Sequence, residues 1–254
     1  MLDKRRGTAE DYLRPNLGSM AASSSKLAHL LNRLEKFYGK PKPPHLTEPY
    51  EMILYINCGY PATDTSCSKA FDALKRSIGL RVDDILAVPK GKLTKIMKLG
   101  GIFPELRAER LKEIAAVVKE TFAGDLRTVL KKPVPEAKKA LKMFPTIGDP
   151  SAEKILLFTK TAPIAAIPSN CVHVPLRLGF GEEKKNYAAS YRSAQDAIRT
   201  QLPEECGALL RAYLLLKQHG QELCKRSRPC CEQCPVSSDC LYYKRMHYGR
   251  SAPI

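Results

Sequence analysis

The chain has 254 residues, of which 44% are hydrophobic, so it can bury one large core or two smaller ones and is not a disordered tail. Its formal net charge is +16, and nucleic acid fits this charge better than a membrane surface because no segment combines a basic face with exposed bulky apolar residues. No apolar run approaches the ~20 residues of a membrane-spanning helix, and the N-terminus shows no secretion signal.

The first predicted elements are a leader and a helix. Residues 1–25 are polar and lack periodicity, and we interpret them as a disordered leader or the remnant of a tag. Leucines at 27, 30, 31 and 34 then recur at helical spacing, and the prolines at 41, 43 and 44 end that helix.

From Tyr50 onward, apolar residues recur every three or four positions in one segment after another. The residues that mark these segments include Met52, Ile53, Ile56, Ala70, Leu74, Ile78, Leu93, Met97, Leu111, Ile114, Val118, Ile155 and Leu156. A last apolar segment covers residues 208–216. No segment shows the period-two alternation of a half-buried strand, so the sequence predicts an all-α fold.

Residues 141–156 are predicted to form two helices joined by a tight turn over residues 145–148. Asp149 suits the N-cap of the second helix and Pro150 its first helical position. Such a turn presents backbone N–H groups at a helix N-terminus, where a phosphate oxygen can bind without any reading of bases. Taken alone, the segment fits an ordinary αα-hairpin with a glycine turn better, and only the cysteine loop further along the chain reverses that preference.

Four cysteines near the C-terminus, Cys224, Cys231, Cys234 and Cys240, follow the pattern C-x6-C-x2-C-x5-C. Four thiolates in one short loop can hold a single metal centre, and four-cysteine ligation is what a [4Fe-4S] cluster needs. Zinc is the alternative, but its fingers usually pair two C-x2-C knuckles across a longer spacer, and only one is present. Cys230 permits a rival assignment shifted by one residue. We predict a [4Fe-4S] cluster as the cofactor.

The hairpin and the cysteine loop together resemble the helix-hairpin-helix DNA glycosylases, in particular the endonuclease III-like branch with its C-terminal iron–sulfur loop. The resemblance runs from about Pro49 to Cys240. Residues 144–148 are similar to the family's LPGVG, and residues 167–180 to its segment VDTNVLRVLVRLGF. It implies two helical lobes with a DNA groove between them: a helical-barrel domain over 51–163 with the hairpin, and a cluster domain made by 26–50 plus 164–245.

Two positions that carry this family's chemistry differ here. Bifunctional members place a lysine, whose amine attacks the sugar and forms a Schiff base, at the position of Pro150. An aspartate that stabilises positive charge on the sugar, or activates the attacking water, stands in the family at the position of Pro168. Tyr60 and Pro61 replace two glutamines of the helix that displaces the base, and Ile56 replaces the glutamate of the adenine-specific branch.

The resemblance therefore implies a DNA repair protein, an N-glycosylase of base excision that acts on a damaged or mismatched base without lyase activity. The alternative, which Pro168 favours, is a catalytically degenerate DNA-binding protein that recognises lesions or DNA structure. We expect a monomer on double-stranded DNA, in the cytoplasm at the nucleoid or in the nucleus of a eukaryote. No catalytic residue is assigned. The predicted DNA-binding residues are Pro145, Thr146, Ile147, Gly148, Lys154 and Tyr60, and the predicted cluster ligands are Cys224, Cys231, Cys234 and Cys240.

Overall fold

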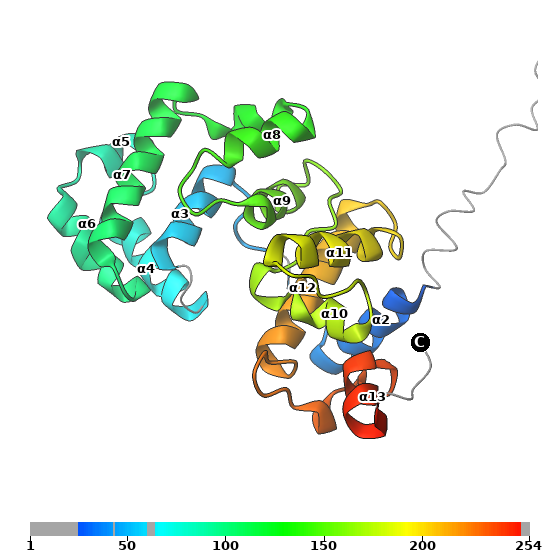
Figure 1. Cartoon of the computed structure of the whole chain (residues 1–254). Helices are drawn as coiled ribbons and strands as arrows, with labels where there is room; N and C mark the ends of the chain where they lie inside the picture. The colour runs from blue at the N-terminus through cyan, green and yellow to red at the C-terminus, as the bar shows by residue number, and fades with distance from the viewer. Residues whose placement is uncertain (1–24, 43, 60–63, 250–254) are drawn as a thin grey trace, which may run out of the picture. The chain divides into compact units, whose positions relative to one another are not determined.

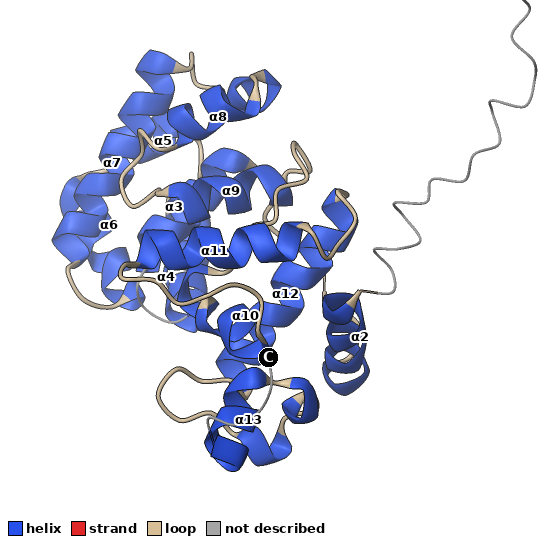
Figure 2. Cartoon of the chain, turned by 45° about the vertical axis from the view of Figure 1, so that its right-hand side comes forward, coloured by secondary structure: helices blue, strands red, loops and turns tan. Residues whose placement is uncertain are grey.

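The computed structural model describes residues 25–42, 44–59 and 64–249. Residues 1–24 of the predicted leader lie outside the described residues, as do Tyr60 and Pro61. Within the described ranges every regular element is a helix (Figure 2), which confirms the all-α prediction. In this part of the chain no helix has the length and apolar character needed to cross a bilayer.

The chain divides into two units. Lys42–Ser169 forms one of them, which we call the hairpin unit. The other, which we call the cysteine unit, combines the described residues before Lys42 with those from Asn170 onward.

The hairpin unit is built around one helix that is buried on nearly all sides. Its elements are α3 (Pro49–Gly59), α4 (Asp64–Ser77), α5 (Val82–Ala87), α6 (Lys90–Met97), η2 (Lys98–Gly100), α7 (Pro104–Thr121), η3 (Leu126–Lys131), α8 (Val134–Leu141) and α9 (Asp149–Phe158). Nine of the eleven residues of α3 are buried, which suits a helix that is apolar all round. It packs against α4 and α7 (Figure 1), so that α3 forms the core of this unit.

The cysteine unit joins an N-terminal helix to the C-terminal segment. Its elements are α2 (Lys26–Tyr38), η4 (Ser169–Cys171) at the boundary, α10 (His173–Leu178), α11 (Tyr187–Arg199), α12 (Cys206–Glu222), η5 (Cys231–Gln233), η6 (Ser237–Asp239) and α13 (Leu241–Tyr248). Ser25 caps α2 by accepting a hydrogen bond from the backbone N–H of Ala28 at 3.2 Å. The leucines of α2 are buried, and Glu35 of α2 forms an ion pair with Arg211 of α12.

The start of α9 differs from the prediction by one residue. The N-cap is Gly148, and Asp149 is already the first residue of the helix. The backbone of Gly148 is extended, and its carbonyl accepts from the N–H of Ala152 at 2.9 Å. Asp149 does not cap because its carboxylate instead accepts from Lys142 Nζ at 3.0 Å, which draws the side chain away from the helix end.

Candidate functional site

The turn between α8 and α9 has a defined shape. The N–H of Ile147 donates to the carbonyl of Phe144 at 3.2 Å, which closes a β-turn with Pro145 and Thr146 at its centre. Thr146 has a φ of 66°, so the turn combines proline at its second position with a left-handed third residue, as a type II turn does. Holding a threonine in the left-handed region costs on the order of 1–2 kcal/mol.

The predicted DNA-binding residues of the turn differ in what they can offer. The side chain of Ile147 is buried, so only its backbone is presented to a ligand. Gly148 is exposed, and a Cβ added there would meet nothing closer than Pro150 Cδ at 3.8 Å. Its φ of −96° suits any residue, so the fold itself does not require a glycine. Gly148 has no side chain that could cap the N-terminus of α9, which is the positive end of the helix dipole.

The charged side chains around the hairpin are engaged with one another. Glu153 is buried and forms an ion pair with Lys138, while Asp149 pairs with Lys142. Lys154 places its Nζ 5.3 Å from the centre of the Phe158 ring, a cation–π contact within α9. Glu153, Asp149 and Lys154 therefore all have partners.

Neither Pro150 nor Pro168, the two positions that the sequence resemblance singled out, carries a reactive group. Pro150 is the second residue of α9, half-buried at the start of the helix. Pro168 is buried in the segment between α9 and η4. A proline has neither the amine needed for a Schiff base nor the carboxylate needed to stabilise a charged sugar.

One exposed apolar feature was missed at the level of sequence. Ile102 and Phe103, which we call the apolar tip, are 65% and 66% exposed between η2 and α7. Phe103 is left-handed with a φ of 59°, and Pro104 begins α7 directly after it. The buried Arg107 donates from Nε to the carbonyl of Ile102 at 2.8 Å, which fixes the tip from below. Two bulky apolar residues between glycines and a proline were the available signal.

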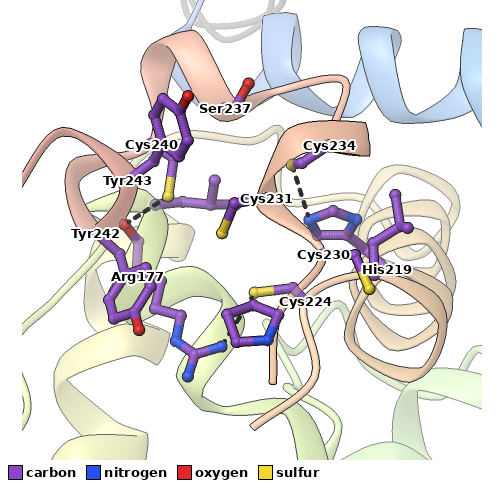
Figure 3. A pocket seen from close by; sticks show the side chains of 13 residues that line it. Arg177, His219, Cys224, Cys230, Cys231, Cys234, Ser237, Cys240, Tyr242 and Tyr243 are labelled. Carbon is purple, nitrogen blue, oxygen red and sulfur yellow. Dashed lines mark hydrogen bonds between the residues drawn. The ribbon is translucent and has the colours of Figure 1, made fainter. Parts of the chain in front are cut away.

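In the cysteine unit, the four predicted ligands line one cavity. Cys224, Cys231, Cys234 and Cys240 all line one small cavity (Figure 3). Cys230 lines the same cavity but lies beside the His219 side chain in this view. The loop folds this way because short 3-10 turns, η5 and η6, each precede a cysteine, so that successive cysteines turn back toward α10 and α12.

Hydrogen-bond donors approach the sulfurs from α10 and α12. Arg177 directs Nη1 toward Cys224 Sγ at 3.5 Å and also donates to the backbone carbonyls of residues 225 and 226. His219 Nε2 lies 3.7 Å from Cys234 Sγ, and its Nδ1 lies 2.9 Å from the hydroxyl of Tyr38. Burial lowers the pKa of His219 to about 4, so its ring is neutral at neutral pH.

Three of the cysteine side chains in this cavity ionise less readily than a free thiol, because their pKa values are raised. Burial, with the neighbouring thiols, raises the pKa of Cys234 to about 11. Burial likewise raises the pKa of Cys224, against the opposing effect of Arg177, and of Cys231. Several thiolates in one cavity repel one another, so this donor set is stable in its metal-binding form only around a positive centre.

Comparison with known proteins shows which proteins this chain resembles in sequence and in fold. No family profile matches the chain. By sequence it is 22% identical to an endonuclease III of Thermotoga maritima, over 82% of this chain and 90% of that protein. It is 29% identical to a thymine/uracil-DNA glycosylase of Methanothermobacter thermautotrophicus, over 64% of this chain and 68% of that protein.

Solved structures of the same kinds of protein superpose on this chain. A non-covalent endonuclease III–DNA complex superposes with a TM-score of 0.70 and 18% identity, covering 88% of this chain and 97% of that one. A thermostable thymine-DNA glycosylase superposes with a TM-score of 0.67 and 23% identity, covering 86% and 95%. The chain is similar in sequence and in fold to the helix-hairpin-helix DNA glycosylases. The chain carries the hairpin and, later in the sequence, the four cysteines, with Pro150 and Pro168 at the two positions singled out from its sequence.

Proposed function

We propose that this chain is a DNA N-glycosylase of base excision that removes a base by hydrolysis and leaves the strand uncut. The observation that carries the proposal is the hairpin: a defined turn, an uncovered helix N-terminus and a glycine that the fold itself does not need. These features suit a phosphate oxygen that approaches the backbone closely. The sequence relatives, which are endonuclease III and thymine/uracil-DNA glycosylases, support the same activity.

The apolar tip gives the proposed enzyme a means of opening the duplex. Enzymes that act on a base must take it out of the stack, and proteins that unstack base pairs often insert apolar side chains. Ile102 and Phe103 are exposed, rigidly anchored by Arg107, and carried by a strongly basic chain. We assign them a wedge role; Tyr60, which the sequence analysis predicted to bind DNA, lies outside the described residues.

The start of α9 supports the proposed absence of lyase activity. Pro150 offers no amine at the family's lysine position, and Lys154, one turn further along the helix, lies against the ring of Phe158. A Schiff base with the sugar therefore has no nucleophile at this place. Base release then depends on water, and on whatever group stabilises the charged sugar.

The cysteine cavity fits an iron–sulfur cluster better than one zinc ion. Zinc draws four sulfurs to about 2.3 Å from a single point. Zinc fingers usually pair two C-x2-C knuckles, whereas this loop has one C-x2-C between spacings of six and five residues, and its four cysteines line one cavity. The cluster would be held by Cys224, Cys231, Cys234 and Cys240. Its positively charged iron core would offset charge on the thiolates and tie the loop together.

A second function is favoured by Pro168. If the buried proline leaves the sugar without electrostatic support, the chain recognises lesions or DNA structure and cuts nothing. Hydrolytic removal of a base and recognition without removal differ only in this step, because both use the hairpin and the tip.

The deciding experiment is a single-turnover assay. Duplexes that each carry one damaged or mismatched base, beginning with uracil or thymine opposite guanine, are incubated with excess protein. Alkali then cleaves any abasic site. Strand cleavage only after alkali supports a monofunctional glycosylase, whereas tight binding of a lesion with no abasic sites in any duplex supports the second function. Cleavage before alkali would contradict the assignment of a hydrolytic enzyme.

A further inference from the structure

The last turn of α3 lies beneath both of the surfaces proposed above to touch DNA. On one side, Asn57 contacts the hairpin. On the other, the carbonyl of Cys58 lies against Gly100, the last residue of η2 before the apolar tip. A Cβ added to Gly100 would lie 1.8 Å from that carbonyl oxygen, so η2 rests on α3 backbone to backbone.

Asn57 uses its whole amide in this position. It is 2% exposed, and its Nδ2 donates to the carbonyl of Ile53 at 3.0 Å and to the carbonyl of Pro145 at 3.1 Å. Its Oδ1 accepts from the hydroxyl of Thr146 at 3.2 Å. Two carbonyl acceptors fix which end of the amide is the nitrogen, so the orientation follows from the network.

The hairpin has a specific need for this support. The third position of a type II turn is left-handed and is usually glycine or asparagine. The family's LPGVG has glycine there, whereas this chain has Thr146, with a φ of 66° and a branched Cβ. Asn57 binds the turn on both sides of that strained peptide, at the carbonyl of Pro145 and at the hydroxyl of Thr146.

We propose that Asn57 is a positioning residue that holds the hairpin in its phosphate-binding shape and at a fixed separation from the apolar tip. The effect on DNA rests on the proposed function, whereas the effect on the shape of the hairpin does not. Asn57 acts from the core through Pro145 and Thr146 and itself touches no nucleotide.

The test is a double-mutant cycle between Asn57→Ala and Thr146→Gly. Asn57→Ala should weaken binding of duplex DNA about tenfold, and equally for all sequences, because it removes the buried support of a backbone contact. In the Thr146→Gly background the same substitution should cost no more than about twofold, because glycine adopts the left-handed conformation unaided. Ser68→Ala is the matched control, since it removes the hydrogen bond between α4 and Tyr55 of α3 without touching the hairpin.

A second measurement needs no DNA. Amide hydrogen exchange of residues 146–148 in the free protein should accelerate in Asn57→Ala, and much less in the double variant. Equal losses of affinity and equal acceleration in both backgrounds would overturn the proposal, since Asn57 would then support only the core. If hydrogen exchange accelerates in Asn57→Ala but not in the double variant, and the parent protein binds no duplex, the positioning role of Asn57 is upheld and the proposed DNA-binding function is refuted.

A variant that leaves α3 untouched covers the case in which Asn57→Ala does not fold. Thr146→Val keeps the shape of the side chain but loses the hydroxyl that donates to Asn57 Oδ1. It should weaken DNA binding and speed exchange at the hairpin, whereas Thr146→Ser, which keeps the hydroxyl, should do so less. Equal DNA affinities and equal exchange rates in the valine and serine variants would overturn the positioning role of Asn57.

Discussion

Replacing Gly148 by aspartate should raise the free energy of unfolding of the protein and lower its affinity for DNA. Gly148 is the N-cap of α9, where aspartate is preferred to glycine by a few tenths of a kcal/mol. Its φ of −96° suits any residue, and the nearest atom to an added Cβ is 3.8 Å away. Losing a glycine also restricts the unfolded chain, worth about 0.4–1 kcal/mol. We expect the free energy of unfolding of Gly148→Asp to rise by about 0.5–1 kcal/mol.

The same carboxylate stands where a phosphate is proposed to bind. Two unit charges about 4 Å apart repel by ~1 kcal/mol in water and ~4 kcal/mol at an effective dielectric constant of 20. The affinity should therefore fall between about 5-fold and about 1,000-fold. Fluorescence anisotropy with a labelled duplex measures the affinity, and denaturant unfolding measures the stability. Gly148→Ala is the uncharged control and should lose less. An aspartate variant that is stable and binds as tightly as the parent would refute a phosphate site at this helix end.

The remaining predictions concern the other sites. Serine at any of the four predicted ligands should remove the broad absorbance near ~400 nm of a cysteine-ligated cluster, whereas Cys230→Ser should keep it; a colourless parent protein with one zinc would contradict the cluster. Borohydride should trap no covalent DNA complex, and trapping that disappears in Lys154→Ala would reveal a relocated nucleophile. Ile102→Ser should bind intact duplex normally but release or expose the target base more slowly, and an unchanged single-turnover rate would remove the tip from the mechanism. Pro168→Asp should raise base release about 100-fold or more if only the carboxylate is missing, and equal release by both forms would place catalysis elsewhere.

The features that sequence could predict are those set by local pattern. The all-α fold follows from apolar residues at intervals of three and four, and the hairpin from a proline and a glycine between two such runs. The N-cap of α9 was misassigned because the cap preferences of Gly148 and Asp149 are similar when considered alone. The ion pair of Asp149 with Lys142 decided between them, and it depends on how α8 packs beside α9.

What sequence could not supply is set by tertiary contact. Asn57 lies in an apolar helix, where its neighbours mark it as an exception without saying what it binds. Its partner Thr146 is distant in sequence and meets it only when α3 packs beneath the hairpin. The exposure of Ile102 and Phe103 was only partly predictable, since the flanking glycines and proline indicate a turn but do not say that its apolar side chains stay exposed.

The same geometry limits which bases such an enzyme could release. Removing a base leaves positive charge on the sugar, and one well-placed stabilising group is worth about 10²–10³ in rate. Pro168 provides none, and the carboxylates near the hairpin are already neutralised, Glu153 by Lys138 and Asp149 by Lys142. A reaction with this little support proceeds fastest when the departing base is itself a stable anion, because less charge must be compensated by the protein. An electron-poor pyrimidine meets that condition better than a purine such as adenine. If Pro168 stands where a catalytic aspartate would, release should therefore be fastest for a base that departs as a stable anion.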